Sequence, residues 1–490
     1  MKWKTRYIRF KKITKRLSRF LFLFISFCLV FTFLLFKSSI VQTKLTNQIG
    51  KFLSNKTNAK ISVEKVDFKP FKTFVLNGLL ILDHHNDTLL YAKDFYIEIK
   101  DFDIETRLVN LQLLELNKAD FNIKKYKGEQ KTNLKLFLSG LIKKNKKRRD
   151  WSISIKDLGL EELNFTYEDD NKVRKDYKVD FKHLKLEHVN ADFNDLVYDK
   201  GVLNVNSKLL SFKEKSGFKI IGLEGNFKMD KNHLIFKEFD LKTPKSHVNG
   251  VIKLEYQSFK SFKYFNTEVK FLGEFENTTV NGVDIAYFAP KIKGFDRKVE
   301  FTGDISGTIS DFKADQLFFS YGKDTKFEGN ISIKGLPNTK TAIIKAEVRD
   351  LETYEHDLQS IPVSPFGSGK TLKTPKWMSN MGKMVFQGEF LGLASQFEAF
   401  GLFQTVAGEI RTDVLFKRDS NNVIQIAGKV NSESFNIGQT LGGKSLGIIS
   451  FSGALDALIK EKEYVLKFSG DIPHFEFRDY AYSDIKMDGE

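Results

Sequence analysis

Several features are scarce in this 490-residue sequence, and each scarcity excludes a class of protein. The single cysteine, Cys28, lies in the N-terminal apolar run, so the rest of the chain offers no disulfide and no cysteine-ligated metal. Only eight prolines occur, and no long Pro-rich or Gly/Ser-rich linker divides the chain. HExxH is absent, and no GxSxG, Walker or GxGxxG motif occurs in the strand-and-helix context that its chemistry requires. We therefore expect no enzyme.

Long apolar runs are also scarce, because residues 20–36 form the only one. Leu, Ile, Val or Phe fills 14 of its 17 positions, and nine basic residues precede it without any acid. This length and charge asymmetry predict a transmembrane anchor at 20–36 behind a cytoplasmic basic tail at 1–19. A cleaved signal peptide is the competing interpretation, but its apolar core is usually shorter and ends at a small-residue cleavage site. A buried helix of a soluble domain would need covering on every side.

The net charge of +16 is a weak indication of a nucleic-acid partner. Nine of the positive charges lie in the first 19 residues, and the remaining chain interleaves Lys with Asp and Glu. The densest internal basic patch, residues 143–149, lacks aromatic residues that could stack on bases. A solvated loop explains this patch, contact with anionic headgroups remains open, and no nucleic-acid partner is expected.

Hydrophobic periodicity predicts a mainly β protein. Apolar residues at helical spacing predict an amphipathic helix at 40–56, and from Ala59 the period changes to two. Short helices are expected only near 133–141 and 374–381. The clearest alternating segments, each expected to be an antiparallel strand with one apolar face, include Ile61–Val63, Trp151–Ile155, Leu163–Tyr167, Tyr177–Phe181 and Ile252–Tyr256.

A sharper repeat, in which glycine takes its turn on the apolar face, marks the second half of the chain. It predicts a strongly curved sheet, although glycines that merely bend an ordinary closed sandwich remain the alternative. The residues expected to line an apolar, lipid-contacting surface are Phe301, Ile305, Ile309, Phe327, Ile331, Ile333, Phe386, Phe390, Ile252 and Leu254. The glycines expected to give the curvature are Gly303, Gly307, Gly329, Gly388 and Gly392.

The histidines cluster only at Asp83-His84-His85-Asn86-Asp87, between two strand-like segments. Such a segment is typical of a polar turn, so we predict no metal site and no cofactor. A carboxylate pair for glycoside hydrolysis needs no local spacing and stays open.

A series of short motifs resembles one known family. In chain order they are Leu76-Asn77-Gly78, residues 82–83 and 87–92, residues 116–121, residues 241–250, residues 303–308, Gly335-Leu336-Pro337, residues 386–392 and residues 401–405. In this order the chain resembles the N-terminal part of TamB-like proteins of the AsmA superfamily, in the form found in Bacteroidetes. The family's C-terminal β-domain is missing, so we expect a fragment of a longer protein.

The resemblance implies an inner-membrane protein with its bulk in the periplasm. It implies an elongated, curved antiparallel sheet that forms a taco-like hydrophobic groove, with a first part at 59–360 and continuing repeats at 375–490. Such proteins are thought to conduct phospholipids between the inner and outer membranes. The alternative is a scaffold for the assembly or secretion of outer-membrane proteins, together with an outer-membrane β-barrel partner. A third class, an exported β hydrolase, would require convergent carboxylates.

Overall fold

The computed structural model describes residue 54 and residues 59–69, 73–103, 106–141, 151–175, 178–338, 340–363, 367–419, 421, 423–460, 463–478 and 480–489. The predicted basic tail, the predicted anchor at 20–36 and nearly all of the predicted amphipathic helix at 40–56 lie outside these residues. None of the helices in the described ranges is both long enough and apolar enough to cross a membrane.

The chain divides into two compact units, each of them mainly β with few short helices. Unit 1 comprises Met1–Lys175, Asp180–Lys200 and Phe212–Lys215, and unit 2 comprises Asp176–Val179, Gly201–Ser211 and Ser216–Glu490. This content confirms the predicted mainly β class.

Among the described residues, unit 1 contains seven complete strands and the last residues of an eighth, at 212–214. The complete strands are β1 (Ile61–Ser62), β2 (Lys65–Lys69), β3 (Thr73–Leu82), β4 (Thr88–Asp103), β5 (Leu108–Lys125), β6 (Ser152–Asp169) and β7 (His183–Asp199). β1 and β2 both pair with β3, and the order then continues through β4, β5, β6 and β7. An apolar cluster on this sheet joins Val66 and Leu79, and Phe137 packs against it from the helix α3 (Asn133–Leu141).

The β5–β6 pair corrects the predicted antiparallel pattern, because these two strands run parallel. A parallel pair requires a crossover connection, and the segment between β5 and β6 is long enough to provide one. It contains α3, whose bounds agree with the helix predicted at 133–141. α3 begins at Asn133, whose buried side chain accepts from the backbone N–H of Lys124 at 2.8 Å.

The predicted strand at Tyr177–Phe181 is also wrong where the structure describes it. Residues 178–182 form a bend and a turn between β6 and β7. The carboxylate of Asp180 accepts from the backbone N–H groups of Lys175 and Lys182 and lies 2.9 Å from His183 Nδ1. These local bonds favour a turn over an extended ladder, although the residues alternate in polarity.

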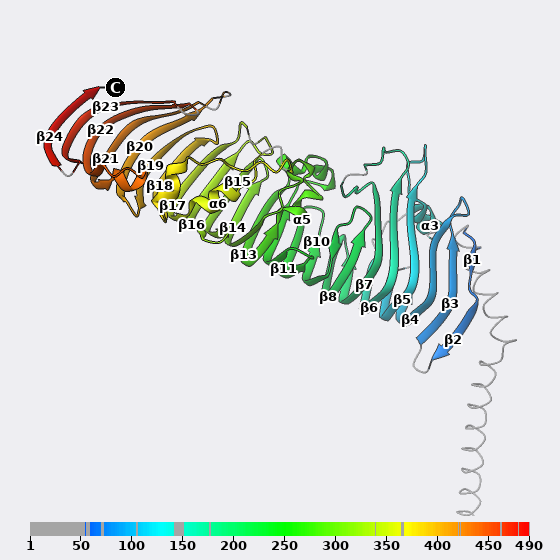
Figure 1. Ribbon diagram of the computed structural model, residues 1–490. Coiled ribbons are helices and arrows are strands. Elements are labelled where there is room, and N and C mark those ends of the chain that lie inside the picture. The colour runs from blue at the N-terminus through cyan, green and yellow to red at the C-terminus, as the bar shows by residue number, and fades with distance from the viewer. Residues whose placement is uncertain are drawn as a thin grey trace, which may run out of the picture. The chain divides into compact units, whose positions relative to one another are not determined.

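Unit 2 contains the remaining strands, which lie side by side in chain order from β10 onward (Figure 1). They are β8 (Val202–Glu214), β9 (Lys219–Ile220), β10 (Gly222–Met229), β11 (His233–Lys242), β12 (His247–Glu255), β13 (Lys270–Asn281), β14 (Lys298–Thr308), β15 (Asp311–Tyr321), β16 (Thr325–Lys334), β17 (Ile343–Thr353), β18 (Met384–Leu393), β19 (Gln396–Thr405), β20 (Gly408–Arg418), β21 (Ile424–Asn436), β22 (Leu446–Lys460), β23 (Glu463–Phe477) and β24 (Tyr480–Gly489). β8 pairs with β10, and each strand from β10 to β24 pairs antiparallel with the next, which gives an open sheet.

Short helical segments lie in the connections of unit 2. They are η1 (Phe259–Tyr264), α4 (Phe265–Glu268), α5 (Gly282–Ala286), η2 (Pro290–Ile292), α6 (Glu355–Ser360), η3 (Lys376–Met381) and α7 (Ile437–Leu441). The helix predicted near 374–381 corresponds to the 3-10 helix η3.

A row of β-bulges crosses unit 2. Register shifts occur at Glu224/Asn226, Phe236/Phe239, His247/Gly250, Phe275/Thr278, Thr302/Asp304 and Ala314/Leu317 on successive strands. A bulge bends its strand and increases the local twist. Strands of unit 2 are accordingly bowed along their length, most plainly from β18 to β24 (Figure 1).

Candidate functional site

The register of unit 2 aligns apolar residues into continuous rows that run across the strands. Residues that pair directly in an antiparallel sheet point to the same face. Row A consists of Phe301, Phe319, Phe327, Leu351, Phe386, Phe403 and Ile410, one from each strand of β14–β20. The rings of Phe319 and Phe327 stack with their centroids 4.9 Å apart.

Two further rows lie on the same face and extend across almost the whole sheet. Row B consists of Val205, Phe227, Phe236, Ile252, Gly273, Ile305, Ala314, Ile331, Ala346, Phe390, Ala399, Val414, Gly428, Leu455, Phe468 and Gly489. Row C consists of Leu203, Met229, Leu234, Leu254, Phe271, Gly307, Phe312, Ile333, Ile344, Gly392, Phe397, Phe416, Ile426, Ala457 and Leu466. Neither row contains a polar or charged side chain.

Neighbouring strands alternate large and small residues along much of row B. From Ile252 to Leu455 the order is Ile252, Gly273, Ile305, Ala314, Ile331, Ala346, Phe390, Ala399, Val414, Gly428 and Leu455. Side chains on the inside of a bend converge, so a large residue on every strand would overfill the space. The alternation therefore limits steric conflict between the side chains of neighbouring strands in row B.

The three rows form one apolar face that a single layer of strands provides. Its central cluster buries Ala314, Leu317, Phe327, Ala346 and Val348, and among the described residues the partly buried apolar side chains packed against this cluster also come from β14–β18. Most large side chains of the rows, Phe301, Ile305 and Phe390 among them, remain only half-buried. A sealed sandwich core would bury them completely between two sheets.

The predicted surface residues mostly fall on this face. Row A contains Phe301, Phe327 and Phe386; row B contains Ile252, Ile305, Ile331 and Phe390; row C contains Leu254 and Ile333. Ile309 is the exception, because it follows β14 in the turn to β15 and lies outside the rows. The geometry therefore brings together nine of these residues on one face.

The predicted glycines lie where neighbouring backbones approach closely. A Cβ at Gly388, whose φ is +156°, would meet the carbonyl oxygen of Phe400 at 2.1 Å. A Cβ at Gly329 would meet the carbonyl oxygen of Glu347 at the same distance, and Gly303 lies opposite the bulge of β15. Gly307 and Gly392 occupy row C itself. These glycines accordingly permit close strand contact as well as bending.

Sequence reasoning missed the bulge residues that lack glycine. Glu238, Asn277 and Gln316 adopt positive φ at the bulges of β11, β13 and β15. The backbone N–H groups of Asn277 and Gln316 donate to Thr302 Oγ1 and Asn330 Oδ1 on the next strand, at 3.0 and 2.9 Å. Asn at position 277 was the only local signal, because Asn tolerates this conformation.

One margin of the apolar face is closed by short helical segments. Met381, Met384, Ala407 and Phe435 form a second buried cluster, against which Trp377 and Met378 of η3, Leu358 of α6 and Ile437 of α7 pack. Phe403 and Ile410 of row A also pack against this cluster. Row A therefore lies beside this helical margin, whereas rows B and C lie farther along the strands.

A buried carboxylate lies beside row A, at the same margin. Asp357 of α6 is 2% exposed and accepts from the backbone N–H groups of Lys323, Asp324 and Thr325 at 3.0, 2.8 and 2.8 Å. Burial alone raises its pKa, but these hydrogen bonds outweigh burial and hold the pKa of Asp357 below the ordinary value. The carboxylate fixes the turn between β15 and β16.

The opposite face of the same strands is polar and solvated. Lys345 and Glu347 of β17 form an ion pair at 3.3 Å, and Arg349 pairs with Glu328 of β16 at 3.2 Å. Hydrogen bonds from Asn330 and Lys345 lower the pKa of Glu347. Isolated apolar side chains such as Leu391 and Phe400 are exposed here without forming a row.

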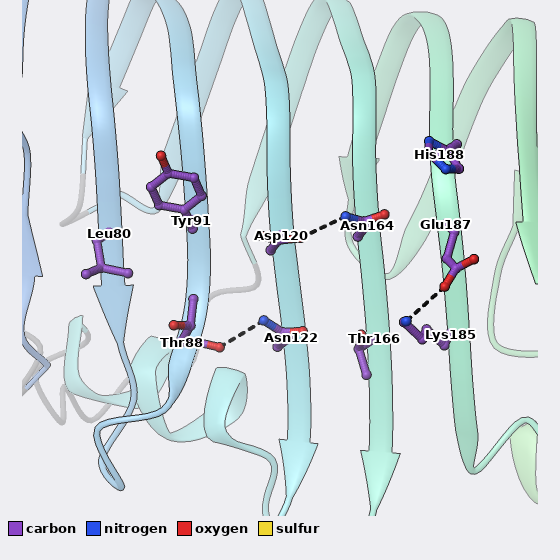
Figure 2. A pocket seen from close by; sticks show the side chains of 10 residues that line it. All are labelled: Leu80, Thr88, Tyr91, Asp120, Asn122, Asn164, Thr166, Lys185, Glu187 and His188. Atoms are coloured by element: carbon purple, nitrogen blue, oxygen red, sulfur yellow. Dashed lines mark hydrogen bonds and ion pairs between the residues drawn. The ribbon is translucent and has the colours of Figure 1, made fainter. Parts of the chain in front are cut away.

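Unit 1 carries a different surface, a polar hollow of about 650 Å³. Figure 2 shows its lining, which is Leu80, Thr88, Tyr91, Asp120, Asn122, Asn164, Thr166, Lys185, Glu187 and His188 from β3–β7. Asn164 Nδ2 donates to Asp120 at 2.9 Å, and Lys185 donates to Glu187 at 2.8 Å (Figure 2). Each of the two acids is thus engaged by a neighbouring donor.

Residues 438–445 match the spacing of a P-loop, with Gly438, Gly443, Lys444 and Ser445 in the characteristic positions. A P-loop needs a strand before the loop and a helix after it, so that the helix N-terminus faces the phosphate. Here the order is reversed, since α7 precedes the loop and β22 follows it. The segment is therefore a helix-to-strand turn, and it lacks the geometry of a phosphate site.

Comparison of the chain with protein-family models, with curated proteins and with solved structures finds no match.

Proposed function

We propose that the apolar face of unit 2 is a hydrophobic groove that holds phospholipid acyl chains and conducts phospholipids between the inner and outer membranes. In this proposal the segment at 20–36 anchors the chain in the inner membrane, and the β structure lies in the periplasm. The observation that carries the proposal is the continuity of rows B and C, which cross the sheet without a charged or polar side chain.

The dimensions of the rows suit this role. Neighbouring strands lie about 4.8 Å apart, so the sixteen strands of row B span about 70 Å. A bilayer core is about 30 Å thick, so one acyl chain reaches about 15 Å and covers about three strands. An acyl chain meets nearly the same apolar contacts at each successive position along the rows. A lipid can therefore move along them without covalent chemistry.

The exposure of the two faces supports the same function. Most large side chains of the rows are only half-buried by their neighbours, which leaves apolar area accessible to a ligand. The opposite face keeps its ion pairs in water. A lipid in this arrangement can place its acyl chains on the rows and leave its headgroup at the solvated margin.

The test introduces a charge into row B. We expect the full-length wild-type chain, purified in detergent after bacterial expression, to carry copurified phospholipid that mass spectrometry detects. The substitution Ile331→Asp should lower the bound phospholipid by the share that occupies the strands around β16, because a carboxylate among acyl chains costs about 2.5–3.5 kcal/mol. Circular dichroism checks that the variant retains its β structure.

Leu391→Asp is the matched control, since Leu391 lies on the opposite face of β18 and is 49% exposed. This variant should bind as much phospholipid as the wild type. Equal lipid in all three proteins, or none in the wild type, would contradict the proposal. If the purified chain instead carries unfolded outer-membrane proteins and no phospholipid, the scaffold function is favoured.

A further inference from the structure

Hydrogen bonds hold the turn between β3 and β4, which carries the adjacent residues His84 and His85. Asp83, which is 5% exposed, accepts from the backbone N–H groups of His85 and Asp87 at 2.8 and 3.0 Å. The other carboxylate oxygen of Asp83 accepts from Tyr126 Oη at 2.6 Å and from Asn133 Nδ2 at 2.9 Å. Two later segments thereby hold the turn, which fixes the direction in which the histidines leave it.

The imidazoles of this turn converge on one carboxylate from the loop after β5. Nε2 of His85 lies 2.8 Å from Glu129 Oε1, and Nε2 of His84 lies 3.0 Å from the same oxygen. The three ligand atoms are all within 4.8 Å of one another.

The loop that carries Glu129 is also held in place. The backbone N–H of Glu129 donates to the carbonyl of Tyr126 at 3.0 Å, and Asn171 Nδ2 donates to the same carbonyl at 3.1 Å. Asn171 Oδ1 in turn accepts from the N–H of Gly128 at 2.8 Å. Both sides of the cluster are therefore organised by hydrogen bonds outside it.

We propose that His84, His85 and Glu129 form a binding site for a divalent transition metal, with Zn²⁺ as the best match. Two imidazole nitrogens, one carboxylate and an open fourth position are a recurrent zinc ligand set. In a tetrahedral site with bonds of about 2.0–2.1 Å, ligand atoms lie about 3.3 Å apart. The distances of 2.8 and 3.0 Å between nitrogen and oxygen need to widen by only a few tenths of an ångström.

The charge around the cluster does not oppose a cation. Lys124 lies over the ring of Tyr126, but its ammonium is 3.8 Å from Asp87 and 3.7 Å from Asp170. The side chains of His84, His85 and Glu129 are 32%, 46% and 28% exposed, so an ion and its water reach them from solvent. A bound ion would join the β3–β4 turn to the loop after β5.

Within the part of the chain that the structure describes, one other group of this kind occurs, at Asp324, His356 and Asp357. It is a poorer candidate because it contains a single imidazole. The oxygens of Asp357 are already occupied by backbone N–H groups and by Thr325 Oγ1. The sequence predicted a polar turn without a metal at Asp83–Asp87, and the proposal departs from that prediction because Glu129, more than forty residues away, gave no local signal.

The test titrates Zn²⁺ into the full-length chain in detergent, in competition with a fluorescent zinc chelator. We expect the wild type to bind one Zn²⁺ per chain at this site. Substitutions of outer-shell groups already weaken metal binding about 10- to 100-fold, so losing a ligand in His84→Asn, His85→Asn or Glu129→Gln should weaken it by about 100-fold or more. X-ray absorption of the zinc-loaded wild type should show two imidazole nitrogens.

The control is the double substitution of a second histidine–glutamate pair in the same unit, His188→Asn with Glu162→Gln. His188 Nδ1 lies 2.6 Å from Glu162 Oε2, and no second imidazole joins them. Zinc affinity should be unchanged in this variant. The proposal is overturned if the wild type binds no zinc at 100 µM, or if the three ligand variants bind it as tightly as the wild type. Unchanged circular dichroism of the variants excludes misfolding as the cause of a loss.

Discussion

The two faces of the unit 2 sheet use the same strands but follow different rules. On the apolar face, row B contains no charged residue, and large and small side chains alternate from Ile252 to Leu455. On the opposite face, charged side chains such as Lys345 and Glu347 form ion pairs in water, and bulky residues such as Phe400 are exposed singly. The difference indicates that packing and apolar continuity constrain one face, whereas solubility alone constrains the other.

The helical margin of the sheet shows how strictly unpaired charge is excluded from the apolar face. Asp357 is a buried charge beside row A, and its oxygens accept from three backbone N–H groups and the Thr325 hydroxyl. A buried charge is tolerated only with such a set of partners. Charges such as Lys345, which is 53% exposed, need none of this because water solvates them.

The largest expected effect comes from adding a side chain where strands touch. Gly388→Val would place Cβ 2.1 Å from the carbonyl oxygen of Phe400 at a φ of +156°. The clash cannot be relieved by a flexible side chain, so we expect a loss of about 4 kcal/mol or more in the free energy of unfolding. Urea unfolding followed by circular dichroism measures the loss.

Gly443→Val is the control for this substitution. Gly443 has ordinary φ, and a Cβ there would meet no atom within 4 Å. Its urea midpoint should stay within experimental error of the wild type. A Gly388→Val protein as stable as this control would show that the strands separate easily and that the close approach is unimportant.

The sequence predicted which residues lie on the apolar face better than it predicted the bulges that orient some of them. Strict alternation in β14, β16 and β18 revealed Phe301, Phe327 and Phe386 because no residue interrupts the period within their motifs. In β15, however, a bulge sets Asp315 and Gln316 opposite the single residue Asn330 of β16. Ala314 and Leu317 therefore share a face although they are three residues apart. A period-two pattern cannot reveal this, since the extra residue reverses the apparent face.

The topology of unit 1 escaped the sequence for a related reason. Alternation predicted strands within β6, but it carries no information about the direction of β6 relative to β5. That direction depends on the connection, where the helix at Asn133–Leu141 was predicted, yet its role in a parallel crossover was not. The cluster of His84, His85 and Glu129 depends on the same long-range arrangement, because Glu129 leaves the end of β5 beside the β3–β4 turn.

A substitution of Asp357, the buried charge at the helical margin of the apolar face, should have an intermediate effect. Asp357→Asn removes the charge and turns an amide N–H₂ toward backbone donors, so we expect a loss of about 2–3 kcal/mol at neutral pH. The wild-type pKa is depressed below 3.8, so its contribution is complete above that pH and is lost as pH falls through the depressed value. The difference in unfolding free energy between the two proteins should therefore shrink in acid.

Unfolding in urea at pH 7 and at about pH 3 measures this difference. The control is Asp324→Asn, because the Asp324 side chain is 50% exposed and forms an ion pair with the exposed His356. A difference between wild type and Asp357→Asn that stays constant with pH would argue against an ionised, hydrogen-bonded carboxylate at the end of row A.

The smallest expected effect tests whether the alternation of row B is itself required. Ala346 lies between Ile331 and Phe390, so Ala346→Ile places three large side chains side by side on the apolar face. Overpacking of this kind should lower the free energy of unfolding by about 1–2 kcal/mol. The double variant Ile331→Ala with Ala346→Ile restores one large and one small residue at this strand pair, so it should recover part of the loss. If the double variant is instead as unstable as the sum of its two single variants, the two positions do not share space, and the alternation is a coincidence of sequence rather than a packing rule that separates this face from the other.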